Sequence, residues 1–300
     1  MTERAVVRRL LTVHPFGRRL AGRFVAGDTL EDGMEVARAL RSQGIASMLD
    51  HLGEEVESPG QAADAADAYV RALKRIAEEP DLDCNISVKL TQLGLKTSRE
   101  LCGENLERVL QAASGPDRRT LVMIDMEAHE YVEPTLDVYL SLRERYANLG
   151  VCLQAYLNRS ADDCARIGRP GAIVRMTKGA YLEPPNVAYQ TRRQVRRNFA
   201  RLAATLLVAG STVHLATHDP KLIDGATAFV RTRSISRKRY EFQMLYGVRR
   251  DLQTRLARQG EPVRVYIPYG TRWYPYLTRR LAERPANLWF FASNLFRRGG

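Results

Sequence analysis

The sequence lacks the short motifs that identify several common classes of enzyme. It contains no G-x-G-x-x-G dinucleotide fingerprint, no G-x-x-x-x-G-K-[ST] phosphate loop and no G-x-S-x-G nucleophile elbow. Its four cysteines include no C-x-x-C pair, and its five histidines are too few and scattered to suggest a ligand cluster. These absences disfavour a Rossmann dehydrogenase, a P-loop nucleotidase, a serine hydrolase and a metal-dependent enzyme, and no metal site is predicted.

Long apolar runs are also missing. No stretch of eighteen apolar residues occurs, so the sequence predicts no transmembrane helix. The opening MTERAVVRRLL carries charge but lacks the apolar core and small-residue cleavage site of a secretory signal, and none is expected. The cysteines are read as buried free thiols, which suit a reducing compartment and hence a cytoplasmic protein. They are Cys84, Cys102, Cys152 and Cys164.

Basic residues are in excess. Lysine and arginine number 46 against 34 acidic residues, which gives a formal net charge of +12. Arginines crowd the stretch 231–298, for example in RTRSISRKRY. A solvated arginine-rich surface explains this excess, and an anionic lipid surface or a nucleic acid as partner remain the alternatives.

What the sequence does contain is a regular alternation of apolar runs and amphipathic segments. The runs are rich in β-branched residues and nearly continuous, as in parallel strands that are covered on both faces. AADAADAYVRALKRIAEE precedes the second run, and PTLDVYLSLRERYANLG, which opens on proline and closes on glycine, precedes the fourth. The eight predicted strands are 46–50, 85–90, 120–127, 151–156, 172–178, 212–218, 240–245 and 263–268.

This rhythm predicts an α/β protein with a (β/α)₈, TIM-like barrel. No linker divides the chain, so we expect one domain over residues 1–300. Within it, a helical N-terminal arm (1–45) should precede the barrel (46–300), whose final helix carries paired arginines. The segment RSADDCARIGRPG is short for a crossover and should hold one compact helix.

Polar residues gather at the C-terminal ends of the predicted strands, which is the end where barrels of this type carry their active sites. A buried polar group costs free energy unless it is satisfied, so the whole set indicates function. Its cations suit an anionic substrate or a phosphorylated cofactor. The set comprises Asp50, Lys89, Asp125, Glu127, Gln154, Arg175, Lys178, Thr217, His218, Asp219, Gln243 and Tyr266.

A second polar group follows the last strand. On a helix, Tyr276, Arg279, Arg280 and Glu283 would share one face, with Arg284 beside them. Paired guanidinium groups facing a barrel mouth can clamp a carboxylate through bidentate hydrogen bonds. An exposed helix laced by ion pairs is the alternative.

The segment YLTRRLAERPAN resembles the Y-x-x-R-R-x-x-E signature of the proline dehydrogenase family. The resemblance extends over most of the chain, and its further motifs follow in the family's order. It is to the monofunctional bacterial enzymes and to the matching domain of the bifunctional proline utilization proteins. The motifs are DHLGE (50–54), ISVKL (86–90), IDME (124–127), QAY (154–156), RMTKGAY (175–181), THD (217–219), EFQMLYG (241–247) and YIPYG (266–270).

The resemblance implies oxidation of L-proline to Δ¹-pyrroline-5-carboxylate, by hydride transfer from proline C5 to N5 of a bound FAD. It also implies that the electrons pass to a membrane quinone, as the first step of proline catabolism. Lys89, Arg279 and Arg280 would bind the substrate carboxylate, and Glu54 would pair with Arg279 as a gate. The residues that would enclose the pyrrolidine ring are Tyr266, Tyr276 and Leu245, and Tyr266 leaves little room for a 4-hydroxyl group.

The resemblance also implies roles around the cofactor. Arg175 would lie near flavin N5 and stabilise the reduced ring, with Asp125 orienting the neighbouring basic groups, so Lys89, Arg175 and Asp125 are the expected catalytic residues. Leu182 stands where many relatives carry tryptophan. The cofactor contacts implied are Asp125, Gln154, Arg175, Lys178, Gly179, Ala180, Thr217, His218 and Glu241.

Two other functions stay open at this point. One is a Schiff-base aldolase on the same barrel, with Lys89 as nucleophile. The other is a basic module that binds nucleic acid or membrane without catalysis. Under the preferred interpretation we expect proline and a quinone as partners, no nucleic acid, and a cytoplasmic protein in peripheral contact with the inner face of the cell membrane.

Overall fold

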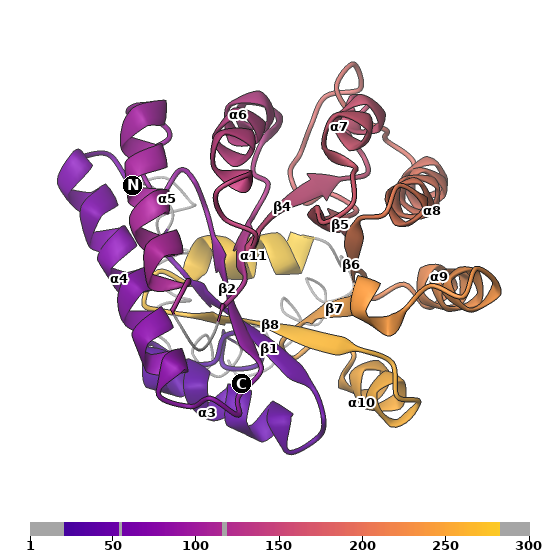
Figure 1. Cartoon of the computed structure of the whole chain (residues 1–300), viewed down its shortest axis with the longest axis horizontal. Coiled ribbons are helices and arrows are strands. Elements are labelled where there is room, and N and C mark those ends of the chain that lie inside the picture. The colour runs from indigo at the N-terminus through magenta and orange to yellow at the C-terminus, as the bar shows by residue number, and fades with distance from the viewer. Residues whose placement is uncertain (1–20, 54–55, 116–118, 283–300) are drawn as a thin grey trace, which may run out of the picture.

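The computed structural model describes residues 21–53, 56–115 and 119–282, without the side chains of 279–282. Eight parallel strands close into a barrel in chain order, with β8 pairing to β1 (Figure 1). The predicted (β/α)₈ barrel is therefore confirmed. The strands are β1 (Ala46–His51), β2 (Cys84–Val88), β3 (Val122–Ile124), β4 (Leu149–Gln154), β5 (Ile173–Thr177), β6 (Thr212–Ala216), β7 (Tyr240–Leu245) and β8 (Val263–Tyr269).

Most strands place apolar side chains on the outer face of the barrel and polar ones in its interior. On β5, Val174 and Met176 are buried, as expected for the face that packs against the surrounding helices. Arg175 lies between them and reaches the side chains of Met48 on β1, Asp125 after β3 and Gln243 on β7. A side chain that contacts strands on several sides must lie inside the barrel. The interior is thus a hydrogen-bonded polar core, unlike the branched apolar layers that fill most barrels of this type.

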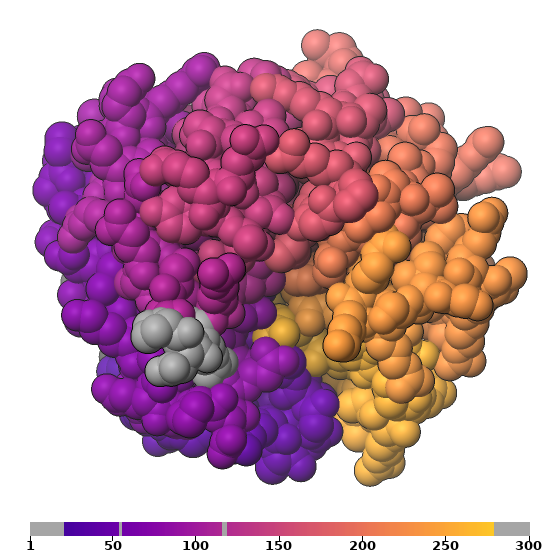
Figure 2. Space-filling view, in the orientation of Figure 1, coloured from indigo at the N-terminus to yellow at the C-terminus, as the bar shows by residue number. Residues whose placement is uncertain are grey.

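Helices surround the strands in chain order, and Figure 2 shows side chains closing over the centre of one face of the ring. None of the helices in the described part of the chain has the length and apolar character needed to span a bilayer. All four cysteines are buried free thiols, as predicted. The helices that follow β1 to β7 are α4 (Pro59–Ala77), α5 (Arg99–Ala112), α6 (Val132–Arg143), α7 (Ser160–Ile167), α8 (Arg192–Val208), α9 (Pro220–Thr232) and α10 (Arg250–Arg258).

The described part of the expected N-terminal arm belongs to this ring. Helix α3 (Leu30–Arg41) packs against β1 and β8, beside α4 in Figure 1. Thr29 begins it with a capping box, since its hydroxyl accepts from the Asp32 backbone and the Asp32 carboxylate accepts from the Thr29 backbone. The chain thus uses α3 to cover the strand pair that the helix after β8 leaves uncovered.

Helix α11 (Tyr274–Ala282), the predicted C-terminal helix, lies across the barrel opening behind the strands in Figure 1. Tyr276 and Leu277 are buried in a small apolar cluster with Leu52, which follows β1. Tyr266 of β8 packs against the same cluster. Helix α11 therefore covers the C-terminal ends of β1 and β8, the end at which the site was predicted.

Two predicted boundaries around β3 and β4 are wrong. The run 120–127 yields only three strand residues, because the chain leaves the sheet at Asp125. Helix α6 ends at Arg143 and Gly150, predicted to close it, lies inside β4. A Cβ at Gly150 would stand 2.7 Å from Met123 Cε and 3.1 Å from the Ile173 carbonyl, so glycine is required by close packing between strands.

Candidate active site

Asp125 is the centre of a cluster at the C-terminal end of the barrel. Its Oδ1 accepts a hydrogen bond from Ser87 Oγ at 2.7 Å and forms an ion pair with the Arg175 guanidinium. Its Oδ2 accepts from Tyr266 Oη at 2.7 Å and from Lys89 Nζ at 3.2 Å. Side chains from β2, β5 and β8 and from the segment after β2 thus converge on one carboxylate, which fixes their relative positions.

Lys89 lies one residue beyond β2 and joins two acids. Its Nζ donates to Asp50 Oδ1 at 2.7 Å as well as to Asp125, and it also contacts Tyr266 Oη at 3.3 Å. Lys89 is buried and Asp50 fully so. Because two carboxylates surround it, the charged ammonium form of Lys89 is favoured over the neutral amine that a Schiff-base nucleophile requires.

Arg175 is held from three sides. Its Nε donates to Gln243 Oε1 at 2.7 Å, its Nη1 pairs with Asp125, and its Cζ lies 5.4 Å from the centre of the Tyr266 ring. A guanidinium fixed by an anion, an amide and an aromatic face keeps one orientation, with little entropy left to lose when a ligand arrives.

The two acids of this cluster are shifted in opposite directions. Burial alone would raise the pKa of Asp125, but Lys89 and Arg175 outweigh it and the pKa is lowered. Burial raises the pKa of Asp50, with Lys89 opposing it and the negative Asp125 adding to it. Burial likewise raises the pKa of Tyr266. Asp125 is therefore the permanent anion of the site, and Asp50 is the group that takes up a proton more readily.

A second group lies at the ends of β5, β6 and β7. Asp219 begins α9 and accepts hydrogen bonds from Lys178 Nζ at 2.8 Å and Arg196 Nε at 2.9 Å. Although burial raises the pKa of Asp219, these two cations lower it to about 2. The backbone amide of Leu245 donates to His218 Nε2 at 2.9 Å. The predicted residues Lys178, His218 and Leu245 thus stand on neighbouring strand ends.

The other residues predicted to contact the cofactor lie at or just after the ends of β4, β5 and β6. Thr217 is buried and Ala180 is exposed. Gly179 has a φ of +111°, and a Cβ there would overlap the Tyr156 ring, so only glycine fits. Gln154, at the end of β4, donates to the Glu127 carbonyl at 2.7 Å.

Glu241 does not lie with this group. It stands at the start of β7, in the N-terminal half of the barrel, where Arg264 Nε donates to its Oε1 at 2.8 Å. Arg264 also donates to Asp83, just before β2, at 3.0 Å. Burial would raise the pKa of Glu241, but Arg264 outweighs it and the pKa is about 2. A cofactor contact of Glu241 is therefore not supported by its position.

Two residues that hold the cluster, Ser87 and His214, were not predicted from the sequence, and Gln243 was predicted only as a member of the polar set. Ser87 stands two residues before Lys89 and so shares its inward face, which was the available signal. Gln243 links Arg175 to His214, donating to His214 Nδ1 at 2.9 Å. Nδ1 then acts as acceptor, so the ring proton of neutral His214 is on Nε2.

The prediction of scattered histidines is wrong for two of them, since His214 and His218 stand in H-x-x-x-H spacing, as in some metal sites. They take different partners, since His214 bonds to Gln243 and His218 to the Leu245 backbone. No group of three histidine, cysteine or acidic side chains suited to a metal ion occurs in the parts of the chain that the structure describes.

Burial lowers the pKa of His214 to about 4. An unfolded histidine has a pKa near 6.5, so between these values only the unfolded chain binds the proton and stability falls as the pH falls. In His214→Asn the acceptor for Gln243 is kept but this titration is lost. Between pH 7 and pH 5 the unmodified protein should lose about 2 kcal/mol more than the variant in urea denaturation. Equal losses would show that His214 does not titrate in this way.

Part of the predicted site lies outside the residues that the structure describes. Glu54, Glu283 and Arg284 are not among the described residues, and the side chains of Arg279 and Arg280 are not described although both belong to α11. Of the residues predicted to enclose the substrate ring, Tyr276 belongs to the apolar cluster under α11 and Tyr266 packs against it. Leu182 is fully exposed.

The chain is similar to known proteins along most of its length. A family model described as Proline dehydrogenase matches residues 34–293. Proline dehydrogenase 1 of Bacillus subtilis (strain 168) is 38% identical over 284 residues, which cover 94% of this chain and 93% of the relative. Proline dehydrogenase of Deinococcus radiodurans is 38% identical over 283 residues, covering 93% and 90%.

Solved structures agree on the fold. Proline utilization A from Bdellovibrio bacteriovorus, inactivated by N-propargylglycine, superposes with a TM-score of 0.81 at 23% identity. The match covers 88% of this chain and 32% of that one, so this chain spans about a third of the larger protein. At this identity the likeness concerns the fold alone. The family model matches residues 34–293, and the two relatives are 38% identical over more than nine tenths of this chain. The chain therefore belongs to the proline dehydrogenase family.

Proposed function

We propose that this protein oxidises L-proline to Δ¹-pyrroline-5-carboxylate with FAD as cofactor and passes the electrons to a membrane quinone, as a single domain over residues 1–300. The observation that carries the proposal is the junction of Lys89, Arg175 and Tyr266 on Asp125 beneath α11. Two fixed cations at the mouth of a barrel suit a small anionic substrate beside an electron-accepting ring.

The residues at the ends of β5 and β6 fit a phosphorylated cofactor. The Gly179 backbone leaves no room for a side chain, which allows close approach, and Lys178 and Arg196 outnumber the single carboxylate of Asp219 between them. We assign the holding of FAD to Gln154, Arg175, Lys178, Gly179, Ala180, Thr217 and His218, with Asp125 acting through Arg175. When bound, FAD supplies a two-electron acceptor. Glu241 is left out because it pairs with Arg264.

The substrate carboxylate would meet Lys89 from below and Arg279 and Arg280 from α11, which crosses the mouth. Glu54 would pair with Arg279 when no substrate is bound. Tyr266, Tyr276 and Leu245 would enclose the ring. Fixing the carboxylate orients the ring carbon that is oxidised, which is the main contribution of these side chains to rate.

Arg280→Met tests this assignment. Loss of one charge-assisted pair to the carboxylate should raise KM for proline by about tenfold or more, while FAD stays bound. Steady-state kinetics and the flavin absorbance of the purified variant measure the two effects. An unchanged KM would remove Arg280 from the carboxylate site.

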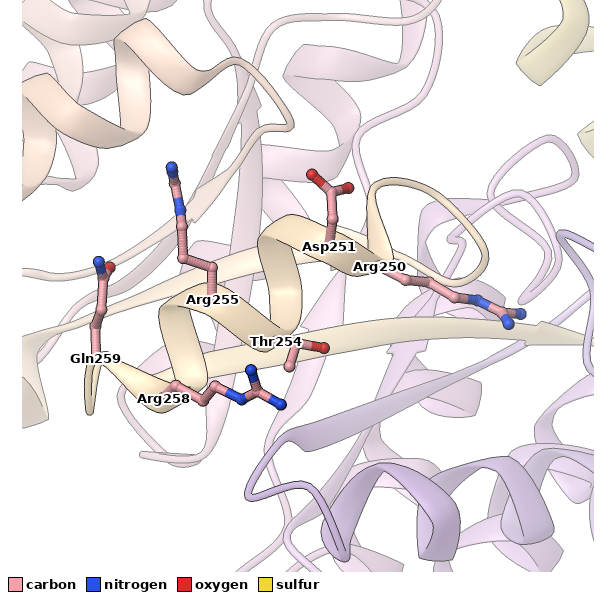
Figure 3. Close-up of a pocket in the computed structure, with 6 residues that line it drawn as sticks. All are labelled: Arg250, Asp251, Thr254, Arg255, Arg258 and Gln259. Atoms are coloured by element: carbon pink, nitrogen blue, oxygen red, sulfur yellow. The ribbon is translucent and has the colours of Figure 1, made fainter.

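Because the proposed electron acceptor is a membrane quinone, the protein must contact a bilayer during turnover. Helix α10 carries Arg250, Arg255 and Arg258 around a shallow surface pocket (Figure 3). This pocket lies on one helix, apart from the barrel cluster, so we do not assign it to the substrate. We propose instead that the arginines attract anionic lipid at the inner face of the cell membrane. Sedimentation with anionic vesicles should decrease as salt rises, and binding that salt does not affect would argue against this contact.

The function itself is tested by cofactor content. The purified chain should carry FAD in near-stoichiometric amount and reduce a soluble quinone when proline is added. A protein that binds no flavin after reconstitution would contradict the proposal.

A further inference from the structure

Asp50 is a second acid in the barrel that the proposed function leaves without a role. It lies near the end of β1, is fully buried, and its Oδ1 accepts from Lys89 Nζ at 2.7 Å. Its Oδ2 is buried too and accepts no hydrogen bond from the part of the chain that the structure describes. A buried carboxylate oxygen without a donor is costly while the group is ionised, and protonation removes that cost.

The surroundings of Asp50 allow that protonation. The groups that act on it or face it are Lys89, Asp125, Tyr266, Tyr69 and Tyr269. Lys89 supplies the one positive charge in contact with it. Asp125, in contrast, accepts from Ser87, Tyr266, Lys89 and Arg175 and is held as an anion. Of the two acids, Asp50 is the one that can gain a proton without losing several hydrogen bonds.

The net charge of the cluster favours transfer of a proton from the substrate ammonium to Asp50. With both acids ionised, Asp50 and Asp125 cancel Lys89 and Arg175, so the four groups have no net charge. Proline arrives as a zwitterion, and its ammonium must become an amine because a positive nitrogen opposes the departure of a hydride from the adjacent carbon. If that proton moves to Asp50, a substrate of charge −1 faces a cluster of charge +1, and no charge has left the buried site.

We propose that Asp50 accepts, through Lys89, the proton that the substrate amine loses before oxidation. The inference rests on the proposed function. An N–H bond of the substrate ammonium breaks and a bond to Lys89 Nζ forms, while Lys89 transfers one of its own protons to Asp50 Oδ1. Lys89 ends as it began and Asp50 ends neutral. When bound, FAD would supply the acceptor for the hydride of the ring carbon. The product then carries an iminium and a carboxylate and has no net charge, and Asp50 returns its proton to solvent through Lys89 after the product has left.

Asp50→Asn tests the proposal with two substrates. Asparagine keeps the size and one oxygen toward Lys89 but cannot take the proton. Proline needs an acceptor at neutral pH. In L-thiazolidine-4-carboxylate a ring sulfur replaces the C4 methylene without adding a substituent, and it lowers the amine pKa so that much of the amine is already neutral. The matched control is Asp83→Asn, which removes a carboxylate from the opposite end of the barrel.

The expected result is a change in the ratio between the substrates. Asp50→Asn should lower kcat/KM for proline on the order of 100-fold at pH 7, and this loss should shrink as the pH rises. The kcat/KM for thiazolidine-4-carboxylate should be affected far less. Asp83→Asn should leave the ratio unchanged. An equal loss on both substrates in Asp50→Asn would overturn the inference, because misfolding or poor binding penalises both.

A binding measurement on the unmodified holoprotein covers the case in which the variant does not fold. Tetrahydrofuran-2-carboxylate has an oxygen in place of the ring nitrogen, so it brings the negative charge without a proton. Calorimetry in buffers of different ionisation enthalpy should show uptake of about one proton per site on binding. No uptake would overturn the inference. If proline fails to reduce the unmodified holoprotein, the proposed function is at fault and not the role of Asp50.

Discussion

Asp125→Leu should abolish most turnover and destabilise the fold. Within the described part of the chain, the substitution removes one of the two ion pairs of Lys89 and the one ion pair of Arg175. Removing one partner of a buried pair costs about 3–5 kcal/mol, because an uncompensated charge stays in the interior. Turnover should fall more than 100-fold in addition, since both cations lose their fixed positions. Urea denaturation and steady-state kinetics measure the two losses.

Asp137→Leu is the matched control. Asp137 also contacts two arginines, Arg99 at 2.8 Å and Arg166 at 3.1 Å, but on the surface. Exposed pairs contribute about 0–1 kcal/mol, so this variant should remain stable and active. If Asp125→Leu behaved like Asp137→Leu, Asp125 would not be the centre of the site.

Arg264→Met should destabilise the protein without impairing its chemistry. Arg264 is buried and pairs with Glu241 at 2.8 Å, in the half of the barrel away from the cluster around Asp125. Its loss leaves Glu241 as an unpaired interior charge, at a cost of about 3–5 kcal/mol. Flavin content and turnover per bound flavin should stay close to those of the unmodified protein. A loss of flavin from the folded variant would restore Glu241 as a cofactor contact.

The same pair predicts a pH effect. The pKa of Glu241 is about 2 in the folded protein, below that of a free glutamate. A depressed pKa stabilises above the unfolded value, and this contribution is lost as the pH falls from about 4.5 toward 2. Arg264→Met should lack this acid-dependent loss. Arg255→Met is the control, because Arg255 lies 3.9 Å from its partner Asp224 at the surface. This variant should change neither the free energy of unfolding nor its decrease in acid.

The barrel was predictable because its signal is local. Nearly continuous apolar runs rich in β-branched residues mark the strands, and the helices between them carry their own caps. The errors arose where spatial packing overrides that signal. Gly150 looks like the end of a helix, but the close approach of Met123 and Ile173 places it inside β4.

The sequence predicts which residues belong to the site better than it predicts which of them contact one another. Lys89, Arg175 and Tyr266 follow from strand ends and from the family resemblance, but their meeting on Asp125 depends on barrel closure and strand stagger, which no local pattern encodes. Glu241 could have been excluded in advance, since it is the second residue of its strand and the site lies at the opposite end.

Anaerobic titration of the purified holoprotein with L-proline tests the central claim most directly. The account predicts bleaching of the flavin absorption band by proline and little or none by 4-hydroxyproline, because Tyr266 is expected to leave little room for a 4-hydroxyl group. A flavin that proline does not reduce, or a colourless protein that forms a borohydride-trapped adduct on Lys89, would contradict it.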